Sequence, residues 1–408
     1  MSSSNINTVC ESVETILREK LFHPRINGKA LDDLITEVVS QCKQGSSGDI
    51  ATDINNALKA LDVSNTAFWR TTPGRPVGAQ WMINATLQMF LDNTREVWLF
   101  KDVLAGGIAA RAGVSPGDEL AAVNGVPVNQ EPLFELGKAY RLTIRESLKG
   151  AQKEVSIELP AMGPKNRPPM TEPQALSATI VKPSVGLLRV SAFPAIIGFD
   201  FARQLNGMVE MFKRERCSRL IVDLRANCGG GLGSLRLMSL FTPGRLEVGY
   251  SLSKRELNDN PDSLPVINRI PHTKLGLYLM ALRFKVFHRG RSLKLVTEGL
   301  GTLPFHGNIA ILANESSRSG AEMVAAFAQR NSLAKLVGTK TPGETLGAAN
   351  FKVQDTYRLR IPLVGWFLPN GDVLERKGVS PDLFVSPTLG GLRSGKDEVL
   401  NEALAVLA

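Results

Sequence analysis

Two widely separated segments constrain the fold of this chain most, because each is an apolar run that ends in small and polar residues. They are Leu220–Gly231 (LIVDLRANCGGG) and Ile309–Glu322 (IAILANESSRSGAE). Such runs are typical of buried strands in an α/β layer, where sites form at the points at which strands end and helices begin. One strand delivers a glycine cluster and the other delivers Ser319. Exposed backbone N–H groups beside a hydroxyl are the minimum requirement for acyl transfer, so the two segments together predict that chemistry.

Length and composition indicate a globular protein with more than one domain. A chain of 408 residues with 43% hydrophobic residues exceeds the size of one ordinary core, so about two or three domains are expected. No apolar run approaches the ~20 residues of a membrane helix, and the polar N-terminus lacks the apolar segment of a signal peptide. We therefore expect a cytoplasmic protein without an integral membrane segment.

Charge and cysteine spacing argue against nucleic-acid and metal partners. The formal net charge is +9, but the basic residues are dispersed except at Arg283–Lys294, and no nucleic-acid motif accompanies them. The four cysteines lack the spacing of zinc ligands, which indicates scattered reduced thiols at Cys10, Cys42, Cys217 and Cys228. We expect no nucleic-acid partner, no metal and no organic cofactor, and the sequence leaves the oligomeric state open.

The pattern of apolar residues and turns predicts a multidomain α+β fold. Residues 1–75 carry apolar side chains at helical spacing and predict a helical N-terminal domain. Short apolar runs alternate with turns over 76–162, which predicts a β-module, and the proline-rich stretch 163–184 predicts a linker. Strand and helix patterns alternate over 185–408, with an irregular insertion at 245–303, and predict an α/β layer.

The β-module resembles a PDZ domain. Ala105–Gly125 contains a short helix pattern (GIAARAG) followed by PGDELAAVNG, in which Pro-Gly-Asp and Asn-Gly mark turns on either side of a strand. PDZ domains bind extended peptide ends by adding a strand to a sheet edge. The resemblance implies a peptide-binding role for Gly106, Gly107 and Ile108. The alternative is a structural β-module whose groove is unused.

Ser319 has two interpretations. The first is a capping box, in which Ser319 and Glu322 satisfy backbone donors at the start of the apolar helix that follows. The second is a nucleophile at a helix N-terminus, where the helix dipole stabilises a developing oxyanion. The cluster Gly229–Gly231 favours the second, because glycines let backbone N–H groups face a cleft, as an oxyanion hole requires. The alternative for the cluster itself is a tight strand-to-helix turn.

Four motifs in the second half of the chain occur in a characteristic order. They are DLRANCGG at 223–230, SRSGAEMVAAF at 317–327, VGTKTPGE at 337–344 and ERKGVSPD at 375–382. Together with the helical N-terminal part and the PDZ-like module, they resemble the C-terminal-processing (tail-specific) peptidase family, which includes the tricorn core protease. The resemblance implies a crotonase-like ββα catalytic domain with a serine peptidase site. It places Ser319 at the nucleophile, and Gly229 and Gly320 at the N–H donors of the oxyanion hole.

The general base is where the sequence departs from this family. One branch uses a lysine 25 residues after the serine, and here that position holds Glu344. The other branch uses a histidine from the N-terminal domain and a glutamate before the G-V-x-P-D motif. Asn65 occupies the histidine position, and Glu375 occupies the glutamate position. The nucleophile, the oxyanion glycines and the orienting glutamate are therefore present, but neither usual base is.

Three explanations of the missing base stay open. A positioned base is worth roughly 10²–10⁴-fold in rate, and asparagine cannot accept a proton at pH 7. The chain is a base-disabled Ser-His-Glu enzyme that Asn65→His would restore, or a pseudo-peptidase that binds peptides, or an enzyme in which another group substitutes. The candidates for that substitution are Glu344, Lys340, Lys377, His272 and His288.

Other polar residues near the motifs have structural interpretations. We expect His23, near the end of the first helix, to be exposed. We expect Cys228 to be a small buried residue, and the alternative is a reactive thiol near the site. His306 precedes the strand that leads to Ser319, so we expect it at the opposite strand end.

The predicted function is that of a serine endopeptidase-like hydrolase. Its substrate would be an extended polypeptide, with the peptide C-terminus engaged by the PDZ-like groove, and its intermediate an acyl-enzyme at Ser319. The alternatives are a catalytically disabled peptide-binding scaffold, and an acyl hydrolase or cyclase that acts on a small substrate.

Overall fold

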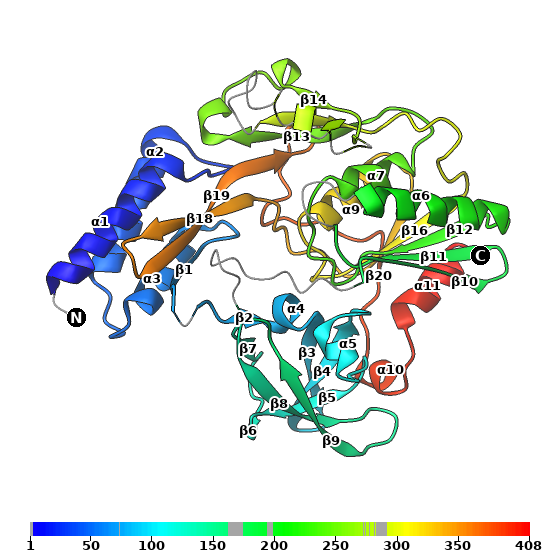
Figure 1. Cartoon of the computed structure of the whole chain (residues 1–408), viewed down its shortest axis with the longest axis horizontal. Coiled ribbons are helices and arrows are strands. Elements are labelled where there is room, and N and C mark those ends of the chain that lie inside the picture. The colour runs from blue at the N-terminus through cyan, green and yellow to red at the C-terminus, as the bar shows by residue number, and fades with distance from the viewer. Residues whose placement is uncertain are drawn as a thin grey trace. The chain divides into compact units, whose positions relative to one another are not determined.

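The computed structural model (Figure 1) describes residues 3–72, 74–161, 174–193, 199–271, 273, 275–276, 278–280, 282 and 292–408. The chain forms two compact units, each built from segments that are far apart in the sequence. Unit 1 comprises Met1–Arg75, Arg245–Glu298 and Gly343–Gly378. Unit 2 comprises Pro76–Gly244, Gly299–Pro342 and Val379–Ala408. His272, His288 and residues 163–173 of the predicted linker lie outside the described residues, whereas Leu176–Lys182 of that predicted linker form a strand.

The N-terminal segment of unit 1 is helical, because its apolar residues recur at helical spacing. The helices are α1 (Ser3–Lys20), α2 (Gly28–Lys43), α3 (Ile50–Leu58) and the short 3₁₀ helix η1 (Lys59–Leu61). The buried side chains of α2 are Leu31, Ile35, Val38, Val39 and Cys42. Helix α3 begins after Asp49, whose carboxylate accepts the N–H of Thr52 at 3.1 Å.

These helices share one core with a six-stranded sheet of unit 1. The strands are β1 (Ala67–Arg70), β13 (Glu247–Ser253), β14 (Val266–Ile267), β15 (Leu293–Val296), β18 (Gly347–Val353) and β19 (Tyr357–Phe367). Their order is β1-β19-β13-β15-β14, and β18 also pairs with β19. The shared core includes Leu17, Ile35, Leu359 and Ile361. The insertion predicted at 245–303 thus supplies three strands, together with the short helices η2 (Lys254–Glu256) and η3 (Pro261–Ser263).

The central sheet of unit 2 brings several strand ends to one edge. Its strands are β10 (Leu176–Lys182), β11 (Val185–Val190), β12 (Arg219–Asp223), β16 (Asn308–Ala313), β17 (Lys335–Gly338) and β20 (Leu383–Phe384), in that order. All neighbours are parallel except β10 and β11. Because parallel strands end at the same edge, the segments after β12 and β16 emerge side by side.

Helices cover both faces of this sheet (Figure 1). Helices α6 (Phe199–Arg214), α7 (Gly233–Ser239) and α9 (Gly320–Arg330) lie on one face. Helix α11 (Glu398–Val406) lies on the other, where Val399 and Ala403 pack against Ile221, Ala310 and Leu312. The short helix α10 (Leu389–Arg393) precedes it. Both faces of β12 and β16 are therefore covered, which explains their continuous apolar sequences.

Residues 76–161 of unit 2 form a six-stranded sheet and a two-stranded sheet, with a core of their own. The strands are β2 (Val77–Gly78), β3 (Ala85–Asp92), β4 (Arg95–Val103), β5 (Glu119–Val123), β6 (Val126–Pro127), β7 (Leu133–Phe134), β8 (Ala139–Arg145) and β9 (Gln152–Glu158). The six-stranded sheet has the order β3-β4-β5-β8-β9, with β6 paired to β5, and β2 pairs with β7 in the two-stranded sheet. Two four-residue helices, α4 (Ala79–Met82) and α5 (Ile108–Arg111), accompany it. Asn124 and Gly125 have φ values of 51° and 80°, as the tight turn between β5 and β6 requires.

His23 corrects one sequence prediction. It was expected to be exposed, but only 6% of its surface is accessible. Its Nε2 lies 3.2 Å from the carbonyl oxygen of Leu61, and its Nδ1 accepts the N–H groups of Arg25 and Ile26 at 3.2 and 3.1 Å. Burial lowers the pKa of His23. The turn after α1 folds back on this imidazole, which a helical pattern alone does not reveal.

The described residues include no helix long and apolar enough to cross a membrane. They also contain no group of three or more His, Cys, Asp or Glu side chains that could hold a metal ion. The four cysteines form no disulfide; Cys228 is partly accessible rather than buried as predicted, because its loop lies at the sheet edge.

Candidate active site

Ser319 stands at a strained position between β16 and α9. Its φ and ψ angles are 52° and −113°, outside the regions that a residue with a Cβ normally adopts. Such a conformation costs of order 1–3 kcal/mol and persists where the surroundings hold it in place. Nucleophilic serines on sharp strand-to-helix turns are held in this way. We call residues 314–319 the serine loop.

Glu322 holds the start of α9 in place. It is fully buried, and its Oε2 accepts the backbone N–H of Ser319 at 3.0 Å, as the predicted capping box requires. Its Oε1 accepts the hydroxyl of Thr341 at 2.7 Å, and Thr341 Oγ1 accepts the N–H of Val379 at 2.8 Å. The backbone of Ser319 is therefore tied to the VGTKTPGE and GVSPD segments.

The glycine cluster lies directly against Ser319. Gly229 has a φ of 82°, and a Cβ on it would lie 2.6 Å from the Cβ of Ser319 and 2.8 Å from the nitrogen of Gly320. No side chain fits at that distance, so glycine is required for the two backbones to approach each other. The structure thus brings together Ser319, Gly229 and Gly320, as the sequence predicted. We call residues 224–231 the glycine loop.

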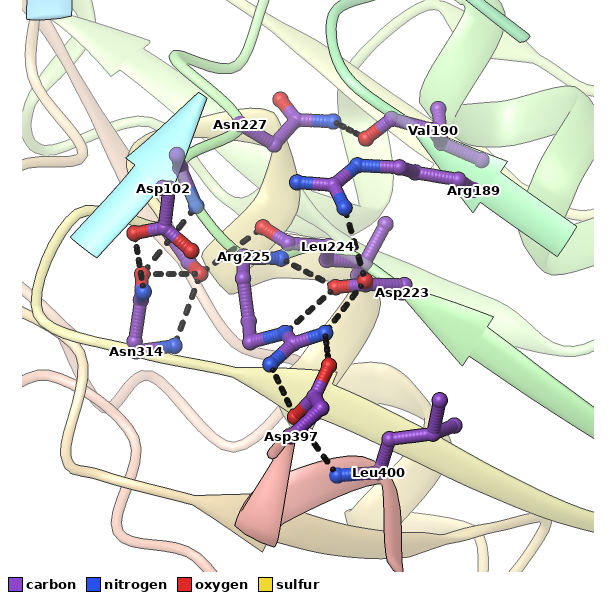
Figure 2. Close-up of polar contacts among 12 residues, drawn as sticks. Asp102, Arg189, Val190, Asp223, Leu224, Arg225, Asn227, Asn314, Asp397 and Leu400 are labelled. Carbon is purple, nitrogen blue, oxygen red and sulfur yellow. Dashed lines mark hydrogen bonds and ion pairs between the residues drawn. The ribbon is translucent and has the colours of Figure 1, made fainter. Parts of the chain in front are cut away.

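The N–H group of Gly229 is already engaged. It donates to Oδ1 of Asn227 at 2.7 Å. Nδ2 of Asn227 in turn donates to the carbonyl of Val190 at 2.7 Å (Figure 2). The carbonyl of Asn227 accepts the N–H of Arg318 at 2.8 Å. The neighbouring nitrogen of Gly230 lies 3.5 Å from the Cβ position of Gly320, so it faces the start of α9.

Asn314 joins the serine loop to the glycine loop. Its Oδ1 accepts the N–H of Ala226 at 3.1 Å, and its Nδ2 donates to Asp102 Oδ2 at 3.0 Å (Figure 2). The hydroxyl of Ser317 donates to the carbonyl of Leu224 at 2.8 Å. The two loops are therefore cross-linked at several points, which fixes Ser319 relative to the glycines.

Arg225 anchors the carboxyl end of β12. Its guanidinium bonds to Asp223 at 2.8 and 2.9 Å and to Asp397, the N-cap of α11, through two bonds of 2.8 Å (Figure 2). Arg189 adds an ion pair to Asp223 at 3.4 Å. Burial acts to raise the pKa of Asp223, but the positive charges of Arg225 and Arg189 outweigh it and hold that pKa at about 2.

The residues at the expected base positions belong to unit 1. Glu375 is buried, and its Oε1 accepts the N–H of Ser64 at 2.6 Å. Its Oε2 accepts the hydroxyl of Ser64 and the N–H of Thr345, both at 3.1 Å. Burial raises the pKa of Glu375, although the hydrogen bonds from Ser64 and Thr345 oppose this shift.

Asn65 follows Ser64 and adopts a left-handed backbone conformation, with a φ of 62°. Its Nδ2 donates to the carbonyl of Leu346 at 3.0 Å and to Ser64 Oγ at 3.3 Å. Asn65 and Glu375 are thus linked through Ser64. Glu344 is partly buried in the same unit.

The two lysines among the candidate bases form no hydrogen bond or ion pair with Ser319 or Glu375 in the described part of the chain. Lys340 and Lys377 are exposed, the first in unit 2 and the second in unit 1. His306 precedes β16 and lies at the end of that strand opposite the serine loop, as predicted.

Of the three residues predicted to bind peptide, Gly107 and Ile108 are buried in the β-module and Gly106 is exposed. The N–H of Gly107 donates to the carbonyl of Leu104 at 3.0 Å, and the N–H of Ile108 points to Asn84 Oδ1 at 3.4 Å. Ile108 is buried, and the carbonyl of Ala105 accepts the N–H of Gln174 at 2.7 Å. A peptide-binding role for Gly106, Gly107 and Ile108 stays a prediction.

Several residues that shape the site were not found by sequence reasoning. Three of them lie inside or beside the motifs: Asn227, Asn314 and Thr341. A polar side chain just after an apolar strand was the sequence signal that could have identified them. Gln80 also reaches the two loops from α4, yet nothing in its own segment distinguishes it.

Comparisons with known proteins relate the chain to a group of peptidases. Residues 184–385 match the family described as Peptidase family S41. A "Probable CtpA-like serine protease" of Staphylococcus aureus (strain N315) is 22% identical over 289 residues, which cover 69% of this chain and 49% of that protein. The chain therefore spans about half the length of the curated relatives it matches.

Two solved structures share the fold. The photosystem II D1 C-terminal processing protease aligns with a TM-score of 0.53 at 13% identity, covering 97% of each chain. Mature CPAF, solved in complex with lactacystin, aligns with a TM-score of 0.56 at 15% identity, covering 99% of this chain and 97% of that one. At such low identity, these alignments establish similarity of fold.

Proposed function

Because residues 184–385 belong to peptidase family S41, we propose that this chain is a serine peptidase that cleaves polypeptides through an acyl-enzyme at Ser319. The observation that carries this proposal is the strained backbone of Ser319, held at the start of α9 against a glycine that leaves no room for a side chain. A structural N-cap does not need this strain, since ordinary N-cap residues adopt extended backbone angles.

The reaction would proceed in two halves. Ser319 Oγ attacks the carbonyl carbon of the peptide bond, its proton passes to a base, and a tetrahedral intermediate forms. Collapse of the intermediate breaks the C–N bond, the leaving amine takes up the proton, and an ester to Ser319 remains. Water then attacks the ester and releases the carboxylic acid, which restores the serine hydroxyl.

The oxyanion would be stabilised by the N–H groups of Gly320 and Gly230. The sequence assigned Gly229 to this task, but its N–H donates to Asn227. We therefore assign Gly229 the role of allowing the close approach of the two loops, and Gly230 that of the donor. One such donor is worth about 10²–10³-fold in kcat, and the dipole of α9 adds to the effect.

Asn65 would make the enzyme slow. The family resemblance places this residue where a histidine acts as the base, and an amide cannot take the proton from Ser319. Glu375 would orient a histidine at that position, because its carboxylate is already fixed by Ser64 and Thr345. Asn65→His is therefore expected to accelerate acylation by roughly 10²-fold or more.

Fluorophosphonate labelling followed by intact-mass measurement tests the proposal. We expect one label per chain at a slow rate, faster labelling in Asn65→His, and none in Ser319→Ala. If neither the unmodified chain nor Asn65→His is labelled while both are folded, the proposed nucleophile is wrong. A parallel assay with a small ester and an unstructured polypeptide distinguishes a peptidase from an acyl hydrolase that acts on small substrates.

A further inference from the structure

Gln80 links the β-module to both loops of the candidate active site. It lies in the short helix α4 and is only 6% exposed, although it carries a polar amide. A buried amide without partners would destabilise the fold, so its contacts are informative. All of them lie within unit 2.

The nitrogen and the oxygen of the Gln80 amide both form hydrogen bonds to groups of the two loops. Its Nε2 donates to the carbonyl of Ser316 at 2.6 Å and to the carbonyl of Ala226 at 3.2 Å. Its Oε1 accepts the Nε–H of Arg318 at 3.1 Å. One side chain thus contacts the glycine loop once and the serine loop twice.

The contacted residues flank the catalytic groups. Arg318 immediately precedes Ser319, and Ala226 lies three residues before Gly229. Ala226 is itself strained, with a φ of 57°, and its N–H is held by Asn314. Gln80 therefore bonds the carbonyl of a strained residue whose other side is already fixed.

We propose that Gln80 is a positioning residue that sets the separation between the serine loop and the glycine loop. The inference rests on the proposed function, since this separation determines where Ser319 Oγ lies relative to the Gly230 and Gly320 N–H groups. Loss of its bonds would let the loops move apart by a fraction of an ångström. Misplacement of about 1 Å can cost about 10²-fold in rate, whereas binding of a small substrate changes little.

Two substitutions separate the contributions of the amide. Gln80→Met keeps the length and approximate volume of the side chain but removes all three bonds. Gln80→Glu keeps the bond from Arg318, but it turns an ionised oxygen toward two carbonyl oxygens. Gln88→Met in β3 is the matched control, because the same chemical change is made at a partly exposed position of the same module.

The test combines kinetics on a small ester with amide hydrogen exchange. For Gln80→Met we expect kcat to fall about 10–100-fold, with KM changed less than about twofold. The N–H groups of Arg318 and Gly229, which bond to Asn227, should exchange faster in this variant. The kcat of Gln80→Glu should be equal to that of Gln80→Met or lower. Gln88→Met should match the unmodified chain in kcat and in amide exchange rates.

The two measurements distinguish failure of this inference from failure of the proposed function. If neither the unmodified chain nor Asn65→His shows turnover or labelling, the proposed function fails, and hydrogen exchange alone then decides the role of Gln80. Exchange rates and kcat in Gln80→Met equal to those of Gln88→Met would overturn the inference. The inference would also be overturned if Gln80→Met raised KM as much as it lowered kcat and lowered the free energy of global unfolding. Such a result would indicate general destabilisation.

Discussion

Ser319 keeps its unusual backbone only because neighbouring residues leave it no alternative. Glu322 holds its N–H, and Gly229 allows the glycine loop to approach within van der Waals distance. The strain of order 1–3 kcal/mol is thus offset by buried hydrogen bonds nearby. A serine that served only as a helix cap could relax to extended angles, so the strain is the mark of a positioned hydroxyl.

Gly229→Ala tests this requirement at a single residue. The new methyl group would lie 2.6 Å from the Cβ of Ser319, at a φ of 82° that alanine disfavours. We expect the free energy of unfolding to fall by about 2–4 kcal/mol and fluorophosphonate labelling to be lost. Urea unfolding and intact-mass measurement provide the two readouts.

Gly207→Ala serves as its control. Gly207 lies within α6, and a Cβ there meets nothing within 4 Å. The substitution should leave labelling intact and raise stability by a few tenths of a kcal/mol to about 1 kcal/mol. Labelling that survives in Gly229→Ala would mean that the close approach is not needed for catalysis.

At the scale of elements, β12 and α11 are joined through ion pairs rather than through apolar packing alone. Arg225 connects Asp223 at the end of β12 to Asp397 at the N-cap of α11. Because Asp223 is fully buried, removal of a partner would leave an uncompensated charge, which is strongly destabilising. The glycine loop begins at this anchored point.

The low pKa of Asp223 predicts how the free energy of unfolding falls at acid pH. Its pKa falls from 3.8 to about 2 on folding, so the stabilisation is complete above about pH 4 and is lost as the pH falls toward 2. The shift corresponds to about 2 kcal/mol. In Asp223→Asn we expect the free energy of unfolding to vary less with pH between about 4 and 2. Urea unfolding at several pH values measures this slope.

Asp200→Asn is the control for the pH dependence of unfolding. The side chain of Asp200 is 77% exposed and pairs only with Arg203 among the described residues. Its substitution should leave the slope of the unmodified chain unchanged. An Asp223→Asn slope equal to that of Asp200→Asn would show that another group controls acid stability.

Much at the element scale could be predicted because the signals are local. The apolar runs ending at Asp223 and Ala313 predicted the two strands, and SRSGAE predicted the start of α9. The use of the Gly229 N–H by Asn227 could not be predicted, since hydrogen-bond direction depends on loop coordinates that no spacing encodes. Gln80 was missed because its partners lie more than 140 residues away.

At the scale of the whole molecule, the chain passes repeatedly from one unit to the other. The crossings follow residues 75, 244, 298, 342 and 378. Ser319 and the glycine loop belong to unit 2, whereas Asn65, Glu344 and Glu375 belong to unit 1. Linear segmentation of the sequence cannot show this interleaving, because the strands of 245–298 and 343–378 have partners far away in the chain.

A truncated protein tests whether the first 75 residues are self-sufficient. Their helices bury Leu17, Ile35 and Ile54 in a core shared with Leu359 and Ile361. We expect residues 1–75 alone to show residual helix by circular dichroism but no cooperative thermal unfolding, because the strand residues that complete the core are missing. A cooperative transition in this fragment would contradict the shared core and support an independent helical domain.

The interleaving of the units also affects how the protein is made. Unit 1 is complete only when residue 378 has been synthesised, so helices α1–α3 emerge from the ribosome long before the strands β18 and β19 that cover them. At roughly 5–20 residues per second, this delay lasts about 15–60 s. Ser319 is translated within that interval, before Glu344 and Glu375 exist. Ser319 is therefore synthesised before unit 1 can complete its fold, so any activity that depends on residues of unit 1 arises only after residue 378 has been made.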